Sequence, residues 1–173
     1  MCNKAIFLDR DGVINEDLGY VHHKSQFRFI KGVFEALASL QRLGFKLIVV
    51  TNQAGIARGY YSEEEFASLT TYMLSELNKQ GVVIDKVMHC PHHPEFTGKC
   101  ECRKPAPGMI LAAAKDLKID LQNSFMVGDK LSDIRAGLRS GIKKSYLISE
   151  NNIDGYSSRQ FSTLLEFSHY LSS

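Results

Sequence analysis

The sequence predicts an α/β fold built on a mainly parallel sheet. Short, almost entirely apolar runs of strand length alternate with longer amphipathic segments along the chain of 173 residues. The runs at 5–8 and 45–50 lack regular polar alternation, which is typical of strands buried on both faces. Several runs end on acidic or small polar residues. In open α/β sheets, ligands bind at this carboxyl edge of the strands.

The helices are predicted from apolar spacing and from their end signals. The segment 33–43 has apolar residues at helical intervals, and Gly44 suits its end. Ser62 and Glu65 form a capping box that begins a second helix, which runs to about Lys79. The remaining expected elements are strands at 5–8, 45–50, 82–88, 124–127 and 144–148, helices at 109–117, 134–139 and 161–171, and loops at 17–29, 53–61 and 151–158.

Length and composition limit the class of protein. A chain of this size is most simply one domain, and it can bury about 70% of its unfolded surface. The net charge of +2 is too small to indicate nucleic acid or a membrane surface as a partner. No apolar run has the length of a signal-peptide core or a membrane span. We therefore expect one cytoplasmic domain over 1–173, monomeric by default.

Asp9 and Asp11 stand where the first strand gives way to a loop. The stretch 4–16 reads KAIFLDRDGVINE, and Gly12 lets the backbone turn sharply. A carboxyl group has a reference pKa near ~4, so Asp9 is expected to be ionised and able to act as a nucleophile. Asp11 could hold a metal or pass a proton to a leaving group. Because Asp and Gly also favour turns, this motif alone is equally consistent with a plain turn.

Further polar side chains follow the other strands. Thr51 and Asn52 end the second strand and can donate hydrogen bonds to phosphate oxygens. Asp129 follows the strand at 124–127, Lys130 is beside it, and Asp133 comes one helical turn later. Acids on two strand ends can share one Mg²⁺ through their oxygens. Ordinary strand-to-loop transitions carry the same residue types, so these positions remain candidates at this point.

The loop at 90–102 has the composition of a zinc site. Its potential ligands have the spacing C-x-H-x7-C-x-C, and three thiolates with one imidazole suit a closed tetrahedral zinc. In a cytosolic chain, such clustering favours metal over disulfides. His93 is a rival to the histidine that we prefer. A closed site has no open position, so this zinc is expected to hold the loop. The predicted ligands are Cys90, His92, Cys100 and Cys102.

Arg103 and Lys104 follow the zinc motif directly. Two cations fixed by a metal clip suit phosphate binding, although most basic pairs are simply solvated. An acid nucleophile, a metal-binding acid, a hydroxyl and a lysine together describe phosphoryl transfer. Asp9 would attack phosphorus, and Asp11 would protonate the leaving alkoxide and then deprotonate water. Thr51, Lys104 and Mg²⁺ would offset charge on the transferring oxygens.

Four motifs in order resemble the haloacid dehalogenase superfamily. They are DRDGVIN, VVTNQAGIARG, CPHHP…CECRKPAPGM and MVGDKLSDI, and they span roughly 6–148. Within the superfamily they look most like the heptose-bisphosphate phosphatases. The resemblance implies a doubly wound, Rossmann-like sheet with helices on both faces, a minimal cap and a zinc-clipped loop. It also implies a phosphatase with catalytic Mg²⁺ and structural Zn²⁺ that removes the 7-phosphate of a small sugar bisphosphate, a heptose destined for surface glycans.

The same resemblance assigns roles to residues. It implies Asp9 as nucleophile, Asp11 as acid/base, and Thr51 and Lys104 on the phosphoryl group. Mg²⁺ would be held by Asp9, by Asp129 and by the backbone carbonyl of Asp11. Because the chain has no insertion long enough for a cap domain, loops are expected to select the substrate. The predicted substrate-binding residues are Asp17, Gly19, Tyr20, Asn52, Gln53, Arg103 and Lys130.

Three alternative interpretations stay open at this point. Histidinol-phosphate phosphatases share the zinc motif, so the motif does not separate the two substrates. A signalling receiver domain also uses Asp, Thr, Lys and Mg²⁺, but its phosphorylated Asp lies on a later strand than its acid pair. Here Asp9 and Asp11 share one strand end. A zinc-ribbon binding module would need a second ligand pair and a basic face, and the sequence has neither.

Overall fold

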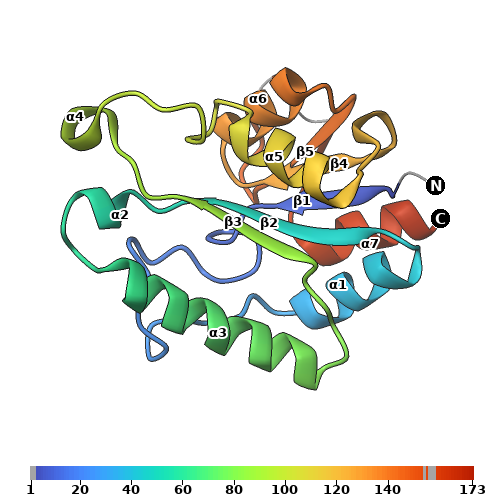
Figure 1. Ribbon diagram of the computed structural model, residues 1–173. Coiled ribbons are helices and arrows are strands. Elements are labelled where there is room, and N and C mark those ends of the chain that lie inside the picture. Colours follow the sequence, from blue (N-terminus) through green and yellow to red (C-terminus); the bar gives the residue numbers. More distant parts are fainter. Residues whose placement is uncertain (1–2, 154, 156–158) are drawn as a thin grey trace.

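The computed structural model describes residues 3–153, 155 and 159–173, and its strands form one parallel sheet (Figure 1). Within these residues the sheet has six strands in the order β3-β2-β1-β4-β5-β6. Each pair in the sheet is parallel, which confirms the predicted fold class. The strands are β1 (Ala5–Leu8), β2 (Lys46–Asn52), β3 (Lys86–Cys90), β4 (Phe125–Gly128), β5 (Lys144–Ile148) and β6 (Gln160–Phe161).

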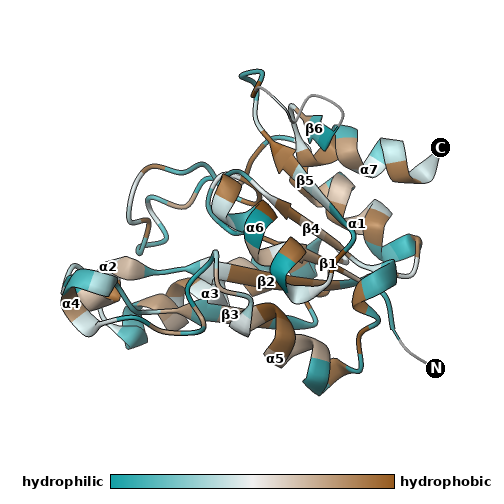
Figure 2. Ribbon diagram, turned by 90° about the horizontal axis from the view of Figure 1, so that it is seen from above, coloured by the Kyte–Doolittle hydropathy of each residue, from teal (hydrophilic) through white to brown (hydrophobic). Residues whose placement is uncertain are grey.

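Helices cover both faces of the sheet, as Figures 1 and 2 show. One face carries α1 (Val33–Arg42), α3 (Glu63–Lys79) and α7 (Leu164–Ser172), and the other carries α5 (Gly108–Leu117) and α6 (Leu131–Ser140). The short helices α2 (Ala54–Ala57) and α4 (Pro94–Thr97) lie in the connections that follow β2 and β3. A single 3₁₀ turn, η1 (Leu121–Asn123), precedes β4.

The alternation of side chains along β1 explains why both faces are covered. Ile6 and Leu8 join the apolar cluster formed with α1, α3 and α7. Ala5 and Phe7 point the other way and join the cluster formed with α5 and α6. All four are fully buried. Because successive side chains of a strand point to opposite faces, an unbroken apolar run requires helices on both sides.

Several predicted boundaries shift for local reasons. Helix α6 begins at Leu131, three residues early, because the Asp133 carboxylate accepts the backbone N–H of Lys130 at 2.9 Å. Strand β3 begins at Lys86 instead of at 82, because the preceding residues connect α3 to the sheet edge. Helix α7 begins at Leu164, and the Thr163 hydroxyl caps it. The two-residue strand β6 was not predicted. The predicted loop over 151–158 includes residues 154 and 156–158, which lie outside the described residues.

Of the helices in the described ranges, none is both long enough and apolar enough to cross a bilayer.

Candidate active site

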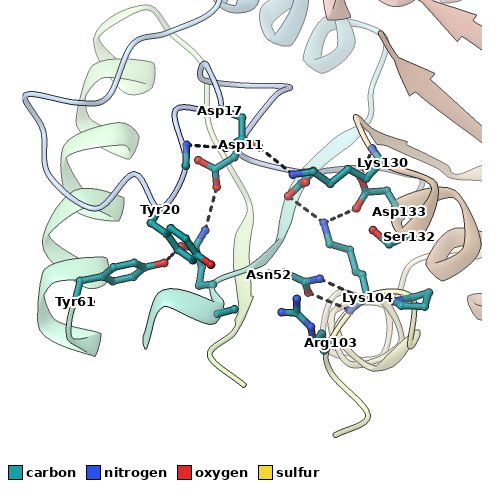
Figure 3. Close-up of a pocket in the computed structure, with 15 residues that line it drawn as sticks. Asp11, Asp17, Tyr20, Asn52, Tyr61, Arg103, Lys104, Lys130, Ser132 and Asp133 are labelled. Carbon is teal, nitrogen blue, oxygen red and sulfur yellow. Dashed lines mark hydrogen bonds and ion pairs between the residues drawn. The ribbon is translucent and has the colours of Figure 1, made fainter. Parts of the chain in front are cut away.

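The carboxyl ends of β1, β2 and β4 meet at a cavity of about 570 Å³ (Figure 3). The register places Leu8 beside Val49 and Val127, so the residues that follow each strand emerge at the same edge. Most of the residues predicted from the sequence line this cavity. They are Asp9, Asp11, Asp17, Gly19, Tyr20, Asn52, Gln53, Arg103, Lys104 and Lys130.

Lys104 lies between two carboxylates at the base of the cavity. Its ammonium is 2.9 Å from Asp9 Oδ1 and 2.6 Å from Asp133 Oδ1, and it donates to the carbonyl of Val50 at 2.7 Å. Only 3% of Lys104 is exposed. The backbone N–H of Arg10 also donates to Asp9 Oδ1. Both donors therefore engage the same oxygen of Asp9, and no donor among the described residues pairs with Oδ2.

Burial and charge set the pKa values of this cluster. Burial raises the pKa of Asp9, the Asp133 carboxylate adds to the rise, and the Lys104 ammonium opposes it. Burial alone would lower the pKa of Lys104, but Asp9 and Asp133 outweigh it and the pKa is raised. The ion pairs therefore keep Lys104 charged although it is removed from water.

Asp11 is held by side chains on three sides. Arg10 donates to both carboxylate oxygens, from Nε to Oδ2 at 3.1 Å and from Nη2 to Oδ1 at 2.9 Å. Asn15 donates to Oδ1 at 3.0 Å, and Gln53 donates to Oδ2 at 3.1 Å. A carboxylate that accepts four hydrogen bonds has little freedom to rotate. The orientation of Asp11 toward the cavity is thus fixed by its neighbours.

Arg10 is a site residue that the sequence analysis missed. It is 1% exposed, and its guanidinium lies 5.9 Å from the ring of Phe27 and 5.8 Å from that of Phe66. It also donates to the carbonyl of Val21, in the loop that follows the site. Burying a guanidinium is costly unless it is paired, and here Asp11 supplies the pairing.

Thr51 and Asp129 are not among the residues that line the cavity. Thr51 is 1% exposed, and its hydroxyl accepts a hydrogen bond from Gln53 at 2.8 Å. Asp129, Asp9 and Asp133 each offer a carboxylate oxygen, and these oxygens lie within 4.8 Å of one another. Asp129 Oδ1 is buried without a hydrogen-bond partner among the described residues.

Two of these acids fit a small, hard cation, because Asp9 Oδ2 and Asp129 Oδ1 have no donor among the described residues, whereas Asp133 pairs with Lys104. Carboxylate oxygens are the ligands that Mg²⁺ prefers. A buried oxygen such as Asp129 Oδ1 is normally paired with a donor or an ion, so its lack of a protein donor favours a bound cation. Gly12, with φ of +84°, leaves room for Asp129, since a Cβ at this position would overlap the carboxylate. Burial and the Asp9 carboxylate raise the pKa of Asp129 to about 7. The side chain of Asp11 lies outside this acid cluster, because Arg10, Asn15 and Gln53 engage it.

The other cations of the cavity differ in how far they are already paired. Lys130 is 2.9 Å from Asp17 Oδ2 and 3.6 Å from Asp129 Oδ2. Burial would raise the pKa of Asp17, but the hydrogen bond and charge of Lys130 outweigh burial, and the pKa is lowered. Arg103 is half-buried, and the one hydrogen bond that its guanidinium makes within the described chain runs to the carbonyl of His92 at 3.3 Å. Arg103 therefore keeps most of its donors for a ligand.

Asn52 fixes the backbone that presents Lys104. Its side-chain amide donates to the Lys104 carbonyl at 3.1 Å and accepts from the Lys104 N–H at 3.0 Å. This double hydrogen bond joins the end of β2 to the segment that follows the cysteine cluster. The amide of Asn52 thus contacts protein backbone in addition to lining the cavity.

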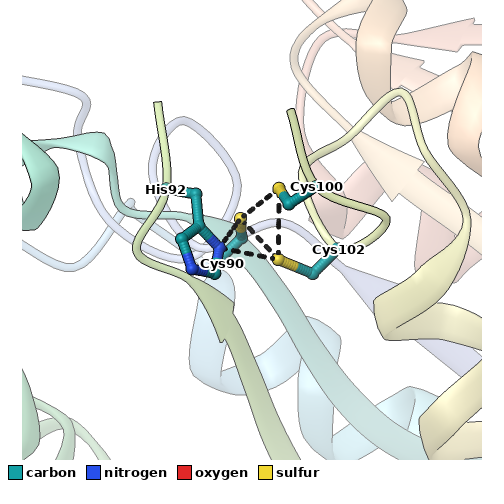
Figure 4. Close-up of side chains that lie close together, drawn as sticks. All are labelled: Cys90, His92, Cys100 and Cys102. Atoms are coloured by element: carbon teal, nitrogen blue, oxygen red, sulfur yellow. Dashed lines mark hydrogen bonds between the residues drawn. The ribbon is translucent and has the colours of Figure 1, made fainter. Parts of the chain in front are cut away.

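The predicted zinc ligands gather at one point, as Figure 4 shows. The Cys100 sulfur is 3.6 Å from that of Cys90 and 3.5 Å from that of Cys102. His92 Nδ1 is 3.3 Å from the Cys102 sulfur. Ligands of a tetrahedral zinc lie roughly 3–4 Å apart, given bond lengths of about 2.0–2.3 Å. The donor set fits zinc, and the sulfurs of Cys90 and Cys102, 2.8 Å apart, lie closer than they would around a bound ion. His93 instead contacts Arg58 at 3.1 Å.

Comparisons with known proteins give the family. Residues 101–151 match the HAD-hydrolase-like family model. A D-glycero-beta-D-manno-heptose-1,7-bisphosphate 7-phosphatase of Haemophilus influenzae is 51% identical over 150 residues, covering 84% of this chain and 82% of that protein. A D-glycero-alpha-D-manno-heptose-1,7-bisphosphate 7-phosphatase of Campylobacter jejuni is 46% identical over 170 residues, covering 98% and 96%. This chain belongs to the heptose-bisphosphate phosphatase family of haloacid dehalogenase-like hydrolases.

Solved structures agree with this family. The D,D-heptose 1,7-bisphosphate phosphatase of B. bronchiseptica, complexed with magnesium and phosphate, has a TM-score of 0.87 and 30% identity, and 98% of each chain is covered. A HAD-like phosphatase from Mesorhizobium loti has a TM-score of 0.85 and 38% identity, covering 96% of this chain and 84% of that one. The protein is a phosphatase, and the histidinol-phosphate and receiver-domain interpretations are not favoured.

The phosphatase cavity has further lining residues that the sequence analysis did not single out as binding residues. Asp133 was noted only as an acid one turn beyond Asp129, and the capping-box spacing after Lys130 was the available signal. Tyr61 gave no signal, because a tyrosine before a helix cap is common in ordinary loops. These additional lining residues are Ala54, Tyr61, Pro105, Ser132 and Asp133.

Proposed function

We propose that this phosphatase removes the 7-phosphate of D-glycero-D-manno-heptose 1,7-bisphosphate through a covalent phosphate on Asp9. One observation carries the proposal: the Asp9–Lys104 ion pair and the largely unengaged Arg103 line the same cavity. A bisphosphate needs cationic donors at two places. We infer that the sugar is a heptose because the relatives are named heptose-1,7-bisphosphate 7-phosphatases. The product would keep its 1-phosphate for nucleotide activation in surface glycan synthesis.

The chemical steps use Asp9 and Asp11. Asp9 Oδ2, the oxygen without a protein donor, attacks phosphorus while the bond from phosphorus to the sugar oxygen breaks. Asp11 enters this step as the carboxylic acid, gives its proton to the departing alkoxide and is left as the carboxylate. Water then attacks the aspartyl-phosphate, Asp11 takes the proton of that water, and Asp9 leaves as phosphate is released. The Lys104 ammonium favours the ionised form of Asp9 that the first step needs.

Asp9, Asp129 and the backbone carbonyl of Asp11 are the proposed holders of Mg²⁺. When bound there, Mg²⁺ would offset charge on the transferring phosphoryl oxygens. The unpartnered Asp129 Oδ1 and the magnesium named with the B. bronchiseptica structure support this. Asp133 is oriented by Lys104 and by the first turn of α6, so we assign it to holding Lys104 in place.

Cys90, His92, Cys100 and Cys102 are the proposed zinc ligands. The carbonyl of His92 accepts a hydrogen bond from Arg103, so the metal clip would set the position of that guanidinium. We also propose that one domain carries the activity, since the cavity lining runs from Asp9 to Asp133.

Arg103→Ala should lower kcat/KM for the heptose bisphosphate by roughly 10–100-fold, because charge-assisted hydrogen bonds to the substrate are lost. An aryl phosphate such as p-nitrophenyl phosphate has no second phosphate, so its kcat/KM should change by less than about threefold. Steady-state kinetics on both substrates measures the difference. Arg42→Ala, at the exposed end of α1, is the matched control. Equal losses on the two substrates would remove Arg103 from substrate selection.

The substrate assignment is tested by comparing kcat/KM over a panel of sugar bisphosphates and histidinol phosphate. Heptose 1,7-bisphosphate is expected to give the highest value. A higher value for histidinol phosphate would overturn the assignment and leave the phosphatase chemistry intact.

A further inference from the structure

Tyr61 begins a chain of hydrogen bonds that ends on two proposed active-site residues. Its hydroxyl donates to Gln53 Oε1 at 2.5 Å. Gln53 Nε2 in turn donates to Asp11 Oδ2 at 3.1 Å and to Thr51 Oγ1 at 2.8 Å. Gln53 is 3% exposed and Tyr61 5%, so water has little access to the chain. Figure 3 shows Tyr61 on the side of the cavity opposite Lys130 and Asp133.

The chemistry of the partners allows only one orientation of the Gln53 amide. Both oxygens of Asp11 act as acceptors here, from Arg10 and Asn15, so the end of the Gln53 amide that faces Asp11 is the donating NH₂ group. That NH₂ has two hydrogens, and Thr51 accepts the second one. The amide oxygen is left to face Tyr61, which must therefore donate. Burial raises the pKa of Tyr61 to about 12, so its phenol keeps the proton that it donates.

The backbone and a neighbouring ring hold Tyr61 in this position. Gly55 makes the space, because a Cβ at this position would overlap the Tyr61 ring. On another side, the imidazole of His22 stacks on the same ring, with centroids 5.0 Å apart and planes 4° apart. The tyrosine hydroxyl thus reaches Gln53 from a ring that is itself fixed.

We propose that Tyr61 is a positioning residue of this phosphatase, which fixes the Gln53 amide so that it directs its two N–H donors to Asp11 and Thr51. The proposal rests on the roles of Asp11 and Thr51 given under the proposed function. Because Thr51 accepts from Gln53, its own hydroxyl hydrogen remains for a phosphoryl oxygen. Because Asp11 accepts from Gln53, its carboxylate keeps one orientation toward the leaving group.

Loss of the Tyr61 hydroxyl would leave Gln53 Oε1 buried without a donor. The amide could then turn over and present its oxygen to the Asp11 carboxylate, where the two would repel. Tyr61→Phe should therefore lower kcat by roughly tenfold and leave KM within about twofold, because the residues disturbed act on the chemical step. The ring stays in place, so the melting temperature should change little.

A double-mutant cycle of Tyr61→Phe and Gln53→Ala, measured as kcat, separates positioning from a general structural role. If Tyr61 acts through Gln53, Tyr61→Phe has no further effect in the Gln53→Ala background. Additive losses, or an unchanged kcat in Tyr61→Phe alone, would overturn the proposal. Tyr72→Phe on α3, whose ring packs 6.2 Å from that of Phe27, is the matched control and should match the wild type.

The cycle is measured with p-nitrophenyl phosphate as well as with the heptose bisphosphate. Failure of the wild type on the heptose bisphosphate would count against the proposed substrate. The ratios of kcat on the aryl phosphate would still decide the role of Tyr61, so the two failures are distinguishable.

Discussion

Asp9→Asn should abolish turnover, with kcat reduced by about 10⁴-fold or more, because the amide has no anionic oxygen to attack phosphorus. The fold should survive. The amide oxygen can still accept from Lys104 and from the Arg10 N–H, as Asp9 Oδ1 does. Steady-state kinetics with Mg²⁺, and a melting curve of the same preparation, measure both effects.

The control for Asp9→Asn is the same exchange at an exposed acid. Asp116 on α5 pairs with Lys86 away from the cavity, so Asp116→Asn should keep the wild-type rate. Both variants must be expressed in cells that lack the wild-type enzyme. Substantial activity of Asp9→Asn in such a preparation would exclude the covalent mechanism.

Cys100→Ser should release the zinc and lower kcat/KM by about 100-fold, because a shift of the loop misplaces Arg103 and Lys104. Structural zinc contributes on the order of 10 kcal/mol of apparent binding energy in small peptides, so loss of one ligand is a large perturbation. The Arg103 hydrogen bond to the His92 carbonyl provides the direct link from the metal to the cavity. Metal analysis and kinetics on the same sample should show both changes together.

Cys2→Ser is the matched control for the zinc prediction, since it makes the same exchange at the cysteine outside the C-x-H-x7-C-x-C motif. Its zinc content should stay near one per chain. If wild-type protein purified without chelators held no tightly bound zinc, the cluster would not be a structural zinc site. If Cys100→Ser lost zinc but kept its kcat/KM, the zinc site would not position Arg103 and Lys104.

Local sequence patterns were sufficient to predict that the site lies at the carboxyl edge of the sheet. The apolar run of β1 ends directly on Asp9, and the parallel order of strands brings the ends of β2 and β4 to the same edge. The residue types at those ends therefore predicted several of the side chains that line the cavity, although Thr51 and Asp129 do not line it. The cysteine motif was equally local, because its four ligands lie within thirteen residues.

Interactions between distant segments could not be predicted in this way. Arg10 lies between two acids in a polar motif, and only the packing of Phe27 and Phe66 around it shows that it is buried. Asp133 pairs with Lys104 at the base of the cavity, which depends on where α6 meets the end of the zinc loop. Tyr61 contacts Gln53 because Gly55 leaves the space for its ring.

The position of the phosphate released tests the central claim most directly. Phosphorus NMR of heptose 1,7-bisphosphate incubated with the enzyme and Mg²⁺ distinguishes the two phosphates through coupling to their different neighbouring protons. We expect the 7-phosphate signal to be replaced by inorganic phosphate while the 1-phosphate signal is retained. Loss of the 1-phosphate signal, or hydrolysis of histidinol phosphate in preference to the bisphosphate when both are present, would contradict the assignment.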